Sequence, residues 1–289
     1  MVGGANVENN NLALNRVFIQ STFKELLTEP SESCPYYTVI RRVINNPEDK
    51  NNGQILSEIY SFINRFHRNE YFYKNTLLNK LLLGVHKPTT TVALTEVPIA
   101  KSRADFILIN GKATVYEIKT ALDTFERLET QLIDYYKAFD HVAVLTDVKN
   151  QEAISSRLND SPVGIYLMTR RGQLRCLKMP ERVVNHLDSS VIFKVLNKAE
   201  FEAILLKIYG KLPSVAPVKY YRECMNWFCD IDISTSYPEV LKQLKLRNKI
   251  MFEDYYSVPY ELKALIYFSH YQKSDYEDLY DFLSKPYAG

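Results

Sequence analysis

The spacing of hydrophobic residues changes character twice along the chain. Up to residue 68, apolar side chains recur every three or four positions, as on one face of a helix. Between residues 69 and 180, short segments rich in β-branched and aromatic residues alternate with helical spacing, which returns alone from 181 to 289. The pattern predicts an amino-terminal helical region (1–68), an α/β core (69–180) and a carboxyl-terminal helical region (181–289). The helices predicted in the two flanks are 14–27, 36–44 and 54–66, then 200–209, 220–229, 238–245, 259–271 and 276–283.

The middle region is predicted to fold as an α-β-β-β-α-β block. A helix that stops at Gly84 precedes three strands, and Asn110-Gly111 marks a hairpin turn between the second and third of them. The next helix has Thr120 or Asp123 placed to cap it. A largely apolar strand follows, as expected for a strand covered on both faces. The predicted elements are helix 71–83, strands 91–99, 103–109 and 113–119, helix 123–139, and strands 141–146, 163–168 and 174–177.

Composition bounds the class of protein. Hydrophobic residues make up 46% of the 289 positions and charged residues 24%, which excludes wholesale disorder and a disulfide-stapled small domain. The four cysteines lack the CxxC spacing of a zinc site. The formal net charge is only +2, so a basic surface for a polyanionic partner has to be local.

Targeting and membrane signals are missing from the sequence. The amino terminus is rich in asparagine and has neither the basic start nor the apolar stretch of a secretory signal. No apolar run approaches the roughly 20 residues that span a bilayer. We therefore expect a cytoplasmic protein with no membrane partner.

The predicted hairpin carries two carboxylates and a lysine among apolar residues. Asp105 lies on its first strand, and Glu117 and Lys119 lie two positions apart on its second. Placing acids together costs free energy, which a bound divalent cation would offset, and carboxylate oxygens suit Mg²⁺ or Mn²⁺. A neighbouring lysine orients the attacking water or balances developing charge. The simpler alternative is that Lys119 belongs to a surface ion pair.

Register tests this interpretation within the sequence. A two-residue Asn110-Gly111 loop would place Asp105 opposite Tyr116, whereas a three-residue loop through Lys112 places it opposite Glu117. We predict the longer loop. Asp105 would then share one face of the hairpin with Glu117 and the lysine two positions on.

The helix after the hairpin adds a second motif. Gln131 and Tyr135 are four residues apart and lie on one helical face. Together with the hairpin, this pattern resembles the PD-(D/E)XK nuclease superfamily, and its last element is similar to the RecB-like branch. The resemblance covers about residues 69 to 150 and leaves both helical flanks unassigned. The motif residues are Asp105, Glu117-x-Lys119 and Gln131-x-x-x-Tyr135.

The resemblance implies a restriction-endonuclease-like core with a mixed sheet and a role for each motif residue. It makes Asp105 and Glu117 metal ligands and Lys119 the catalytic lysine. Gln131 and Tyr135 would contact the nucleic acid or brace the site.

Two positions depart from the family pattern. Ala104 stands where the motif usually has proline. Many members also carry an acid on the first helix, and here Glu70 begins that helix while Glu96 lies on the first strand. We favour Glu96 as the third metal ligand, because a strand next to the hairpin can aim it at the cation.

Nucleic-acid binding requires local positive charge, because contacts from Lys and Arg to phosphate dominate affinity. Lys101 and Arg103 are the best placed, since they lie beside Asp105. A second basic cluster comprises Arg170, Arg171, Arg175 and Lys178. By contrast, residues 251–283 hold seven acids and two lysines, so that stretch is suited to a protein partner or a second copy of the chain.

The sequence thus predicts a Mg²⁺-dependent (or Mn²⁺-dependent) nuclease that hydrolyses phosphodiester bonds, with DNA favoured over RNA. The resemblance implies a bacterial or phage setting such as defence or recombination. The alternative is a non-catalytic nucleic-acid-binding or scaffolding protein that retains the nuclease-like fold.

Overall fold

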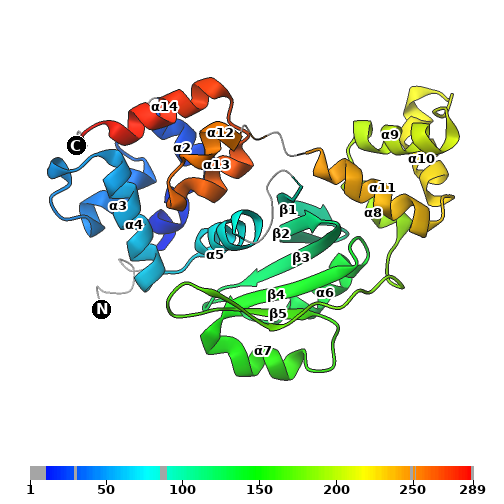
Figure 1. The fold of residues 1–289 in the computed structure, drawn as a ribbon, viewed down its shortest axis with the longest axis horizontal. Helices are drawn as coiled ribbons and strands as arrows, with labels where there is room; N and C mark the ends of the chain where they lie inside the picture. Colours follow the sequence, from blue (N-terminus) through cyan, green and yellow to red (C-terminus); the bar gives the residue numbers. More distant parts are fainter. Residues whose placement is uncertain (1–10, 29–30, 85–89, 248–249, 251, 288–289) are drawn as a thin grey trace. The chain divides into compact units, whose positions relative to one another are not determined.

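The computed structural model describes residues 11–28, 31–84, 90–247, 250 and 252–287. The chain forms two compact units: Met1–Lys80 together with Lys249–Gly289, and Leu81–Asn248 (Figure 1). This division differs from the three consecutive regions expected from the sequence. The reason is that the carboxyl-terminal helices separate, since some pack on the sheet and the last ones pack on the amino-terminal helices.

The second unit is built on a sheet that has six strands within the described residues, ordered β1-β2-β3-β4-β5-β6. β3 and β4 are parallel, as are β4 and β5, whereas the other neighbouring pairs are antiparallel. The fold is therefore mixed α/β, as predicted. The strands are β1 Val92–Ile99, β2 Ser102–Asn110, β3 Lys112–Lys119, β4 His141–Asp147, β5 Gly164–Met168 and β6 Leu174–Lys178.

The predicted order of elements is confirmed along the chain. The parallel pair β3 and β4 requires a crossover, which α6 (Leu128–Tyr136) supplies. Every residue of β4 is buried, which agrees with a strand covered on both faces. Three short α-helices were not predicted: α7 (Gln151–Arg157), α8 (Ser189–Val195) and α12 (Phe252–Tyr256).

Helix α6 begins later than predicted, at Leu128 rather than Asp123. The segment before it is a turn in which the Asp123 carboxylate accepts the backbone N–H of Thr120 at 2.7 Å. Among residues 123–127 only Phe125 is partly buried against the core and the other four are exposed, so this segment lacks the continuous buried stripe of a helix packed on the sheet. The predicted cap was also wrong, because the N-cap residue is Arg127 and no side chain caps the helix.

Helices cover one face of the sheet in the second unit. α6 packs on β2 and β4, α7 on β5, α8 on β1, and α11 on β2. α9 and α10 pack on one another, α10 also contacts α8, and α9 also contacts α11. The helices of this layer not yet bounded are α9 Lys198–Tyr209, α10 Pro217–Cys229 and α11 Ile233–Lys245.

Helix α11 starts five residues before the predicted Pro238, at Ile233. Pro238 is therefore the sixth residue of α11 and lies inside the helix, where it has no backbone N–H to donate to the preceding turn. The Asp232 side chain caps the helix by accepting the Ser234 N–H at 2.8 Å.

The first unit is helical and holds both ends of the chain. Residues 11–17 form one helix, and the predicted helix 14–27 is interrupted at the extended residue Ile19. α14 packs on α2 and α4, and α13 packs on α5. The helices are α2 Gln20–Leu27, α3 Pro35–Val43, α4 Asn52–Phe66, α5 Glu70–Leu77 with a π-helical turn at Leu78–Leu83, α12 Phe252–Tyr256, α13 Lys263–Ser269 and α14 Lys273–Ser284.

Within the described part of the chain, no helix combines the length and the apolar character needed to cross a bilayer.

Candidate metal and nucleic-acid site

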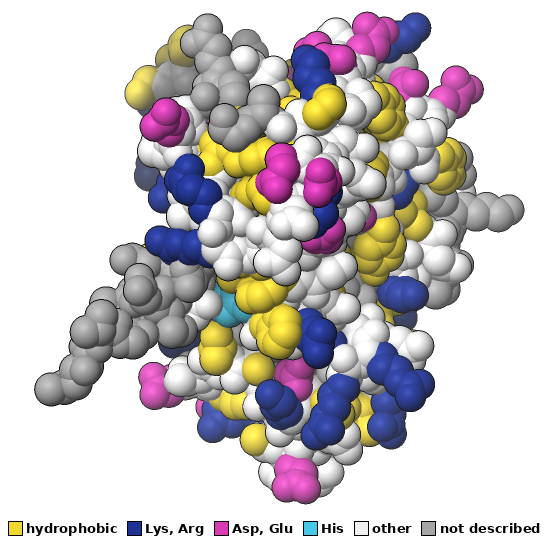
Figure 2. All heavy atoms as spheres, turned by 90° about the vertical axis from the view of Figure 1, so that its left-hand side faces the viewer, with side chains coloured by type: hydrophobic (Ala, Val, Ile, Leu, Met, Phe, Trp, Pro, Cys, Tyr) yellow, Lys and Arg dark blue, Asp and Glu magenta, His cyan; other side chains and the backbone are white. Residues whose placement is uncertain are grey.

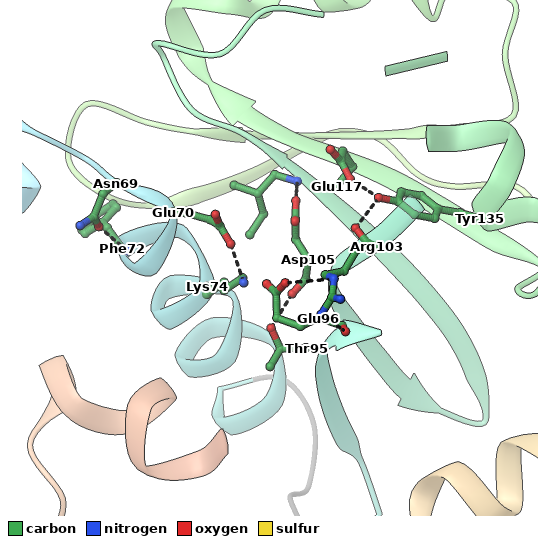
Figure 3. Close-up of polar contacts among 11 residues, drawn as sticks. Asn69, Glu70, Phe72, Lys74, Thr95, Glu96, Arg103, Asp105, Glu117 and Tyr135 are labelled. Carbon is green, nitrogen blue, oxygen red and sulfur yellow. Dashed lines mark hydrogen bonds and ion pairs between the residues drawn. The ribbon is translucent and has the colours of Figure 1, made fainter. Parts of the chain in front are cut away.

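The pairing of β1 with β2 is interrupted at one position, where two acids face each other. Thr95 pairs with Phe106 and Val97 with Ala104, while Glu96 and Asp105 between them are left out of the ladder. Glu96 adopts a left-handed backbone conformation with φ of 55°. One carboxylate oxygen of Glu96 lies within 4.8 Å of one of Asp105 (Figure 3).

This interruption changes which residues of β2 face the helices. Ile107 and Ile109 belong to the core beneath α6. If side chains alternated regularly along the strand, residue 105 would be the next to face this core. Instead Ala104 enters that core. Asp105 is therefore the residue at which the strand changes face.

Neighbouring strands fix Asp105 on both sides. Its Oδ2 atom accepts the backbone N–H of Ile118 on β3 at 2.7 Å (Figure 3). Its carbonyl oxygen accepts the Thr95 hydroxyl on β1 at 2.7 Å. The carboxylate thus points along the sheet toward the backbone of β3.

The predicted hairpin register is confirmed. The ladder runs from Asn110 opposite Lys112, with Gly111 between the two strands, through Ile109 opposite Ala113 to Phe106 opposite Tyr116, which is the register of the predicted longer loop. Asp105 adjoins Phe106 on β2, and Glu117 adjoins Tyr116 on β3. Asp105 was predicted to share one face of the hairpin with Glu117 and Lys119. The structure modifies this prediction, because Asp105 turns toward the Ile118 N–H at the position where β2 changes face.

Glu117 is the centre of a buried polar network. The residue is 1% exposed, and its Oε1 atom lies 2.8 Å from the Lys119 ammonium. The ammonium also donates to Gln131 Oε1 at 2.9 Å. Lys119 is itself only 8% exposed, so the alternative of a surface ion pair is wrong.

Tyr135 closes this network from α6. Its hydroxyl lies within hydrogen-bond distance of Glu117 Oε2 and of the Arg103 carbonyl oxygen, the latter at 2.8 Å (Figure 3). Burial, then the negative charges of Glu117 and Asp105, raise the pKa of Tyr135 well above its usual value. Tyr135 is fully buried, so of the two roles that the motif implied, bracing the site matches its geometry. Gln131 likewise holds the lysine ammonium.

Asp134, between the two motif residues, was missed by the sequence analysis. Its carboxylate accepts the Ser102 hydroxyl at 2.9 Å, the Lys101 backbone N–H at 3.2 Å and the Lys137 ammonium at 2.7 Å. Burial alone would raise the pKa of Asp134, but these hydrogen bonds and the positive charge of Lys137 outweigh it and lower the pKa. α6 is thereby attached to the turn between β1 and β2. The sequence contained a signal for this role, because Asp134 is a charged residue on the helix face next to that of Tyr135.

The other predicted site residues occupy the surface around this network. Lys101 and Arg103 are exposed, and the Arg103 guanidinium lies 4.0 Å from the Glu96 carboxylate. Glu70, the less favoured candidate for the third ligand, begins α5 in the first unit and pairs there with Lys74.

The oxygen donors of the second unit suit a hard divalent cation. Two ligands of one Mg²⁺, each about 2.1 Å from the ion, are at most about 4.2 Å apart, which small side-chain movements of Glu96 and Asp105 can reach from their present separation of under 4.8 Å. Glu117 uses both oxygens in hydrogen bonds, yet each carboxylate oxygen retains a second lone pair. The donor set excludes a soft-metal site, because it contains no thiolate or imidazole.

A second buried carboxylate network lies at the other end of the parallel strands. Asp140 precedes β4, and its oxygens accept the His141 Nδ1–H at 2.8 Å, the Tyr237 hydroxyl at 2.9 Å and the Arg182 guanidinium at 3.0 Å. This network attaches α11 to the sheet. His141 therefore has a structural partner at the end of β4 opposite to Thr146, the residue that pairs with Lys119.

Comparison with known proteins places the chain in a phage family. A family model described as Bacteriophage P4 protein cII matches residues 64–255, which include β1 to β6 and every predicted site residue. The chain belongs to this family.

Individual relatives match over shorter stretches. Protein cII of Enterobacteria phage P4 is 28% identical over 109 residues, which are 37% of this chain. The chain therefore spans about two fifths (41%) of that cII protein's length. The SPO1766 protein of unknown function from Silicibacter pomeroyi shares 16% identity over 45% of this chain and 88% of its own, with a TM-score of 0.29. So low a score carries no information about the fold of this cII-family chain.

Proposed function

We propose that this cII-family protein is a metal-dependent nuclease with a PD-(D/E)XK-like core. The observation that carries the proposal is the interrupted ladder, where Glu96 and Asp105 bring two carboxylates within 4.8 Å beside the strand that holds Glu117 and Lys119. Like charges placed together at a strained backbone cost free energy, and such strain is characteristic of functional sites. The order of elements and the mixed sheet agree with the proposal.

Each residue has a role that follows from its contacts. Glu96 and Asp105 would hold a magnesium or manganese ion, with Glu117 as the adjoining third carboxylate. Such an ion would polarise the phosphodiester and lower the pKa of a bound water. Lys119 is held in place between Glu117 and Gln131, so its ammonium can donate to a phosphate oxygen or to the attacking water. Tyr135 remains protonated and fixes the Glu117 carboxylate.

DNA is the proposed substrate, with Arg103 and Lys101 as exposed cations beside the acids. The alternative is a nucleic-acid-binding or scaffolding protein without catalysis. One observation favours it: both oxygens of Glu117 are engaged by protein groups.

A cleavage assay separates the two functions. Single-stranded DNA, duplex DNA, branched DNA and RNA are incubated with the protein and either Mg²⁺, Mn²⁺ or EDTA. We expect metal-dependent cleavage of DNA that falls about 10³-fold in Asp105→Ala and in Lys119→Ala, because each removes a charged group from the reacting centre. Cleavage that survives both substitutions would show that the activity belongs to another site. No cleavage of any substrate by the folded wild-type protein would reject the nuclease proposal.

A further inference from the structure

The turn between β5 and β6 concentrates positive charge at one edge of the sheet. Residues 163–180 contain three arginines and one lysine and no acid. Arg171 and Arg175 are exposed, and among the described residues neither forms an ion pair. Lys178 is different, because its ammonium is held by the carbonyl oxygens of Leu158, Asn159 and Ser161. The basic cluster predicted from the sequence is thus reduced to its arginines.

The turn presents these arginines on a rigid frame. The Thr169 N–H donates to the Gln173 carbonyl at 2.8 Å, and the Gly172 N–H donates to the Thr169 carbonyl at 2.9 Å. The Gln173 N–H donates to the Thr169 hydroxyl at 3.0 Å. Gly172 has φ of 71°, a conformation that glycine adopts without strain. These bonds fix the backbone from which the arginines project, so binding a ligand has to order only their side chains.

Sheet register connects this turn to the lysine of the proposed site. Lys119 pairs with Thr146, Thr146 pairs with Leu167, and Leu167 pairs with Arg175. Since neighbouring strands are about 4.8 Å apart, Arg175 lies about 14 Å from Lys119 along this row. β3, β4 and β5 all run parallel, so the segments that follow them emerge at the same edge.

Other cations lie at the same edge. The exposed Lys149 follows β4, and its backbone N–H is held by Asp147 at 3.0 Å. The segment after β3 carries Asp123 and Glu126 as well as Arg127, so the basic stretch begins at β4. Figure 2 shows Lys and Arg side chains gathered on the lower part of the face that it presents, with few acids among them.

We infer that the edge formed by Lys149, Arg171 and Arg175 binds the sugar-phosphate backbone of a polynucleotide that extends away from the acid site. This inference rests on the proposed function and adds to it the direction in which the substrate lies. A strand of DNA carries a phosphate about every 3.4 Å of helix axis, so 14 Å corresponds to about four nucleotides. Guanidinium groups suit this ligand because they bind phosphate oxygens in pairs.

Binding of labelled oligonucleotides tests the inference. Every protein carries Lys119→Ala so that no turnover occurs, and anisotropy is measured with oligo-dT of 6 and 20 nucleotides at several salt concentrations. The test variant is Arg171→Ala/Arg175→Ala. The matched control is Lys219→Ala/Arg222→Ala, which removes two exposed charges from α10. Thermal melting confirms that each variant is folded.

We expect the test variant to bind the 20-mer about tenfold more weakly and its salt slope to fall by about 1.4, the value for two contacts to single strands. The 6-mer is longer than the roughly four nucleotides that separate the two places, so it should also lose affinity, and the control should stay within about twofold of its parent. Equal affinities in the test variant and the control would overturn the inference. If the protein with Lys119 intact still cleaves DNA in that case, the nuclease proposal stands and only the binding edge is rejected. Neither binding nor cleavage would reject both. Binding that depends on the arginines without cleavage would support the inference and favour the non-catalytic alternative.

Discussion

Two buried carboxylates of the sheet unit have nearly the same partners and very different surroundings. Glu117 at the end of β3 and Asp140 before β4 each meet a tyrosine hydroxyl and a basic side chain. Asp140 is satisfied by residues from three segments and has a structural role. Glu117 lies next to Asp105, whose carboxylate faces a second acid at a strained break in the sheet. A buried, paired carboxylate is therefore weak evidence for function, and two acids brought together at a strained backbone beside it are the informative feature.

The largest difference should appear when the cation of each network is removed. Lys119→Met leaves Glu117 buried without its counter-ion and should reduce the free energy of unfolding by about 4 kcal/mol. Arg182→Met should cost about 1 kcal/mol or less, because that side chain is 66% exposed. Urea denaturation measures both. If both substitutions reduced the free energy of unfolding equally, the burial of the basic partner would not explain the difference between Glu117 and Asp140.

The tyrosine hydroxyls provide a matched pair. Tyr135→Phe and Tyr237→Phe each remove one buried hydroxyl and should each cost about 1–2 kcal/mol of stability. Only Tyr135→Phe should also slow DNA cleavage, by about 10-fold to 100-fold, because the hydroxyl orients a ligand of the proposed metal. Cleavage is compared at a temperature where both variants are folded. A similar loss of cleavage in Tyr237→Phe would assign the effect to general destabilisation.

The link between α6 and the β1–β2 turn should depend on pH. The pKa of Asp134 is lowered in the folded protein, so its contribution is present above the unfolded pKa of about 3.9 and is lost as pH falls through the lower folded value. Asp134→Asn should reduce the free energy of unfolding by about 1.5 kcal/mol at pH 7, with a smaller difference below pH 4. Denaturation at both pH values checks this. Asp160→Asn, a change at an exposed acid, is the control, and a difference for Asp134→Asn that does not shrink in acid would contradict the assignment.

The smallest effect on stability is expected at Glu96, the acid with a strained backbone. Glu96→Gly should raise the free energy of unfolding by about 0.5–1 kcal/mol, because glycine adopts a positive φ without strain. It should also reduce metal-dependent cleavage. Glu96→Gln keeps the strain and should lose cleavage with unchanged stability. If glycine destabilises the protein instead, as in a regular strand, the left-handed conformation of Glu96 is not a source of strain.

Local patterns were sufficient for much of the fold. Alternation predicted the strands, and the position of Asn110-Gly111 together with the paired acids predicted the hairpin register that is observed. These features depend on residues close together in the chain. The start of α6 was misplaced because residues 123–127 have helical spacing but only Phe125 among them packs partly against the core, and that packing is a property of the tertiary structure.

By itself the sequence determined the candidate chemistry: which residues carry carboxylate, ammonium and guanidinium groups, and that Asp105 and Glu117 follow one another across a hairpin. Only the tertiary structure decided how those groups are used. It opened the ladder at Glu96 and Asp105, buried Lys119 and committed Lys178 to backbone carbonyls. The physical reason is that burial and hydrogen-bond partners come from segments distant in the chain, which local spacing does not specify.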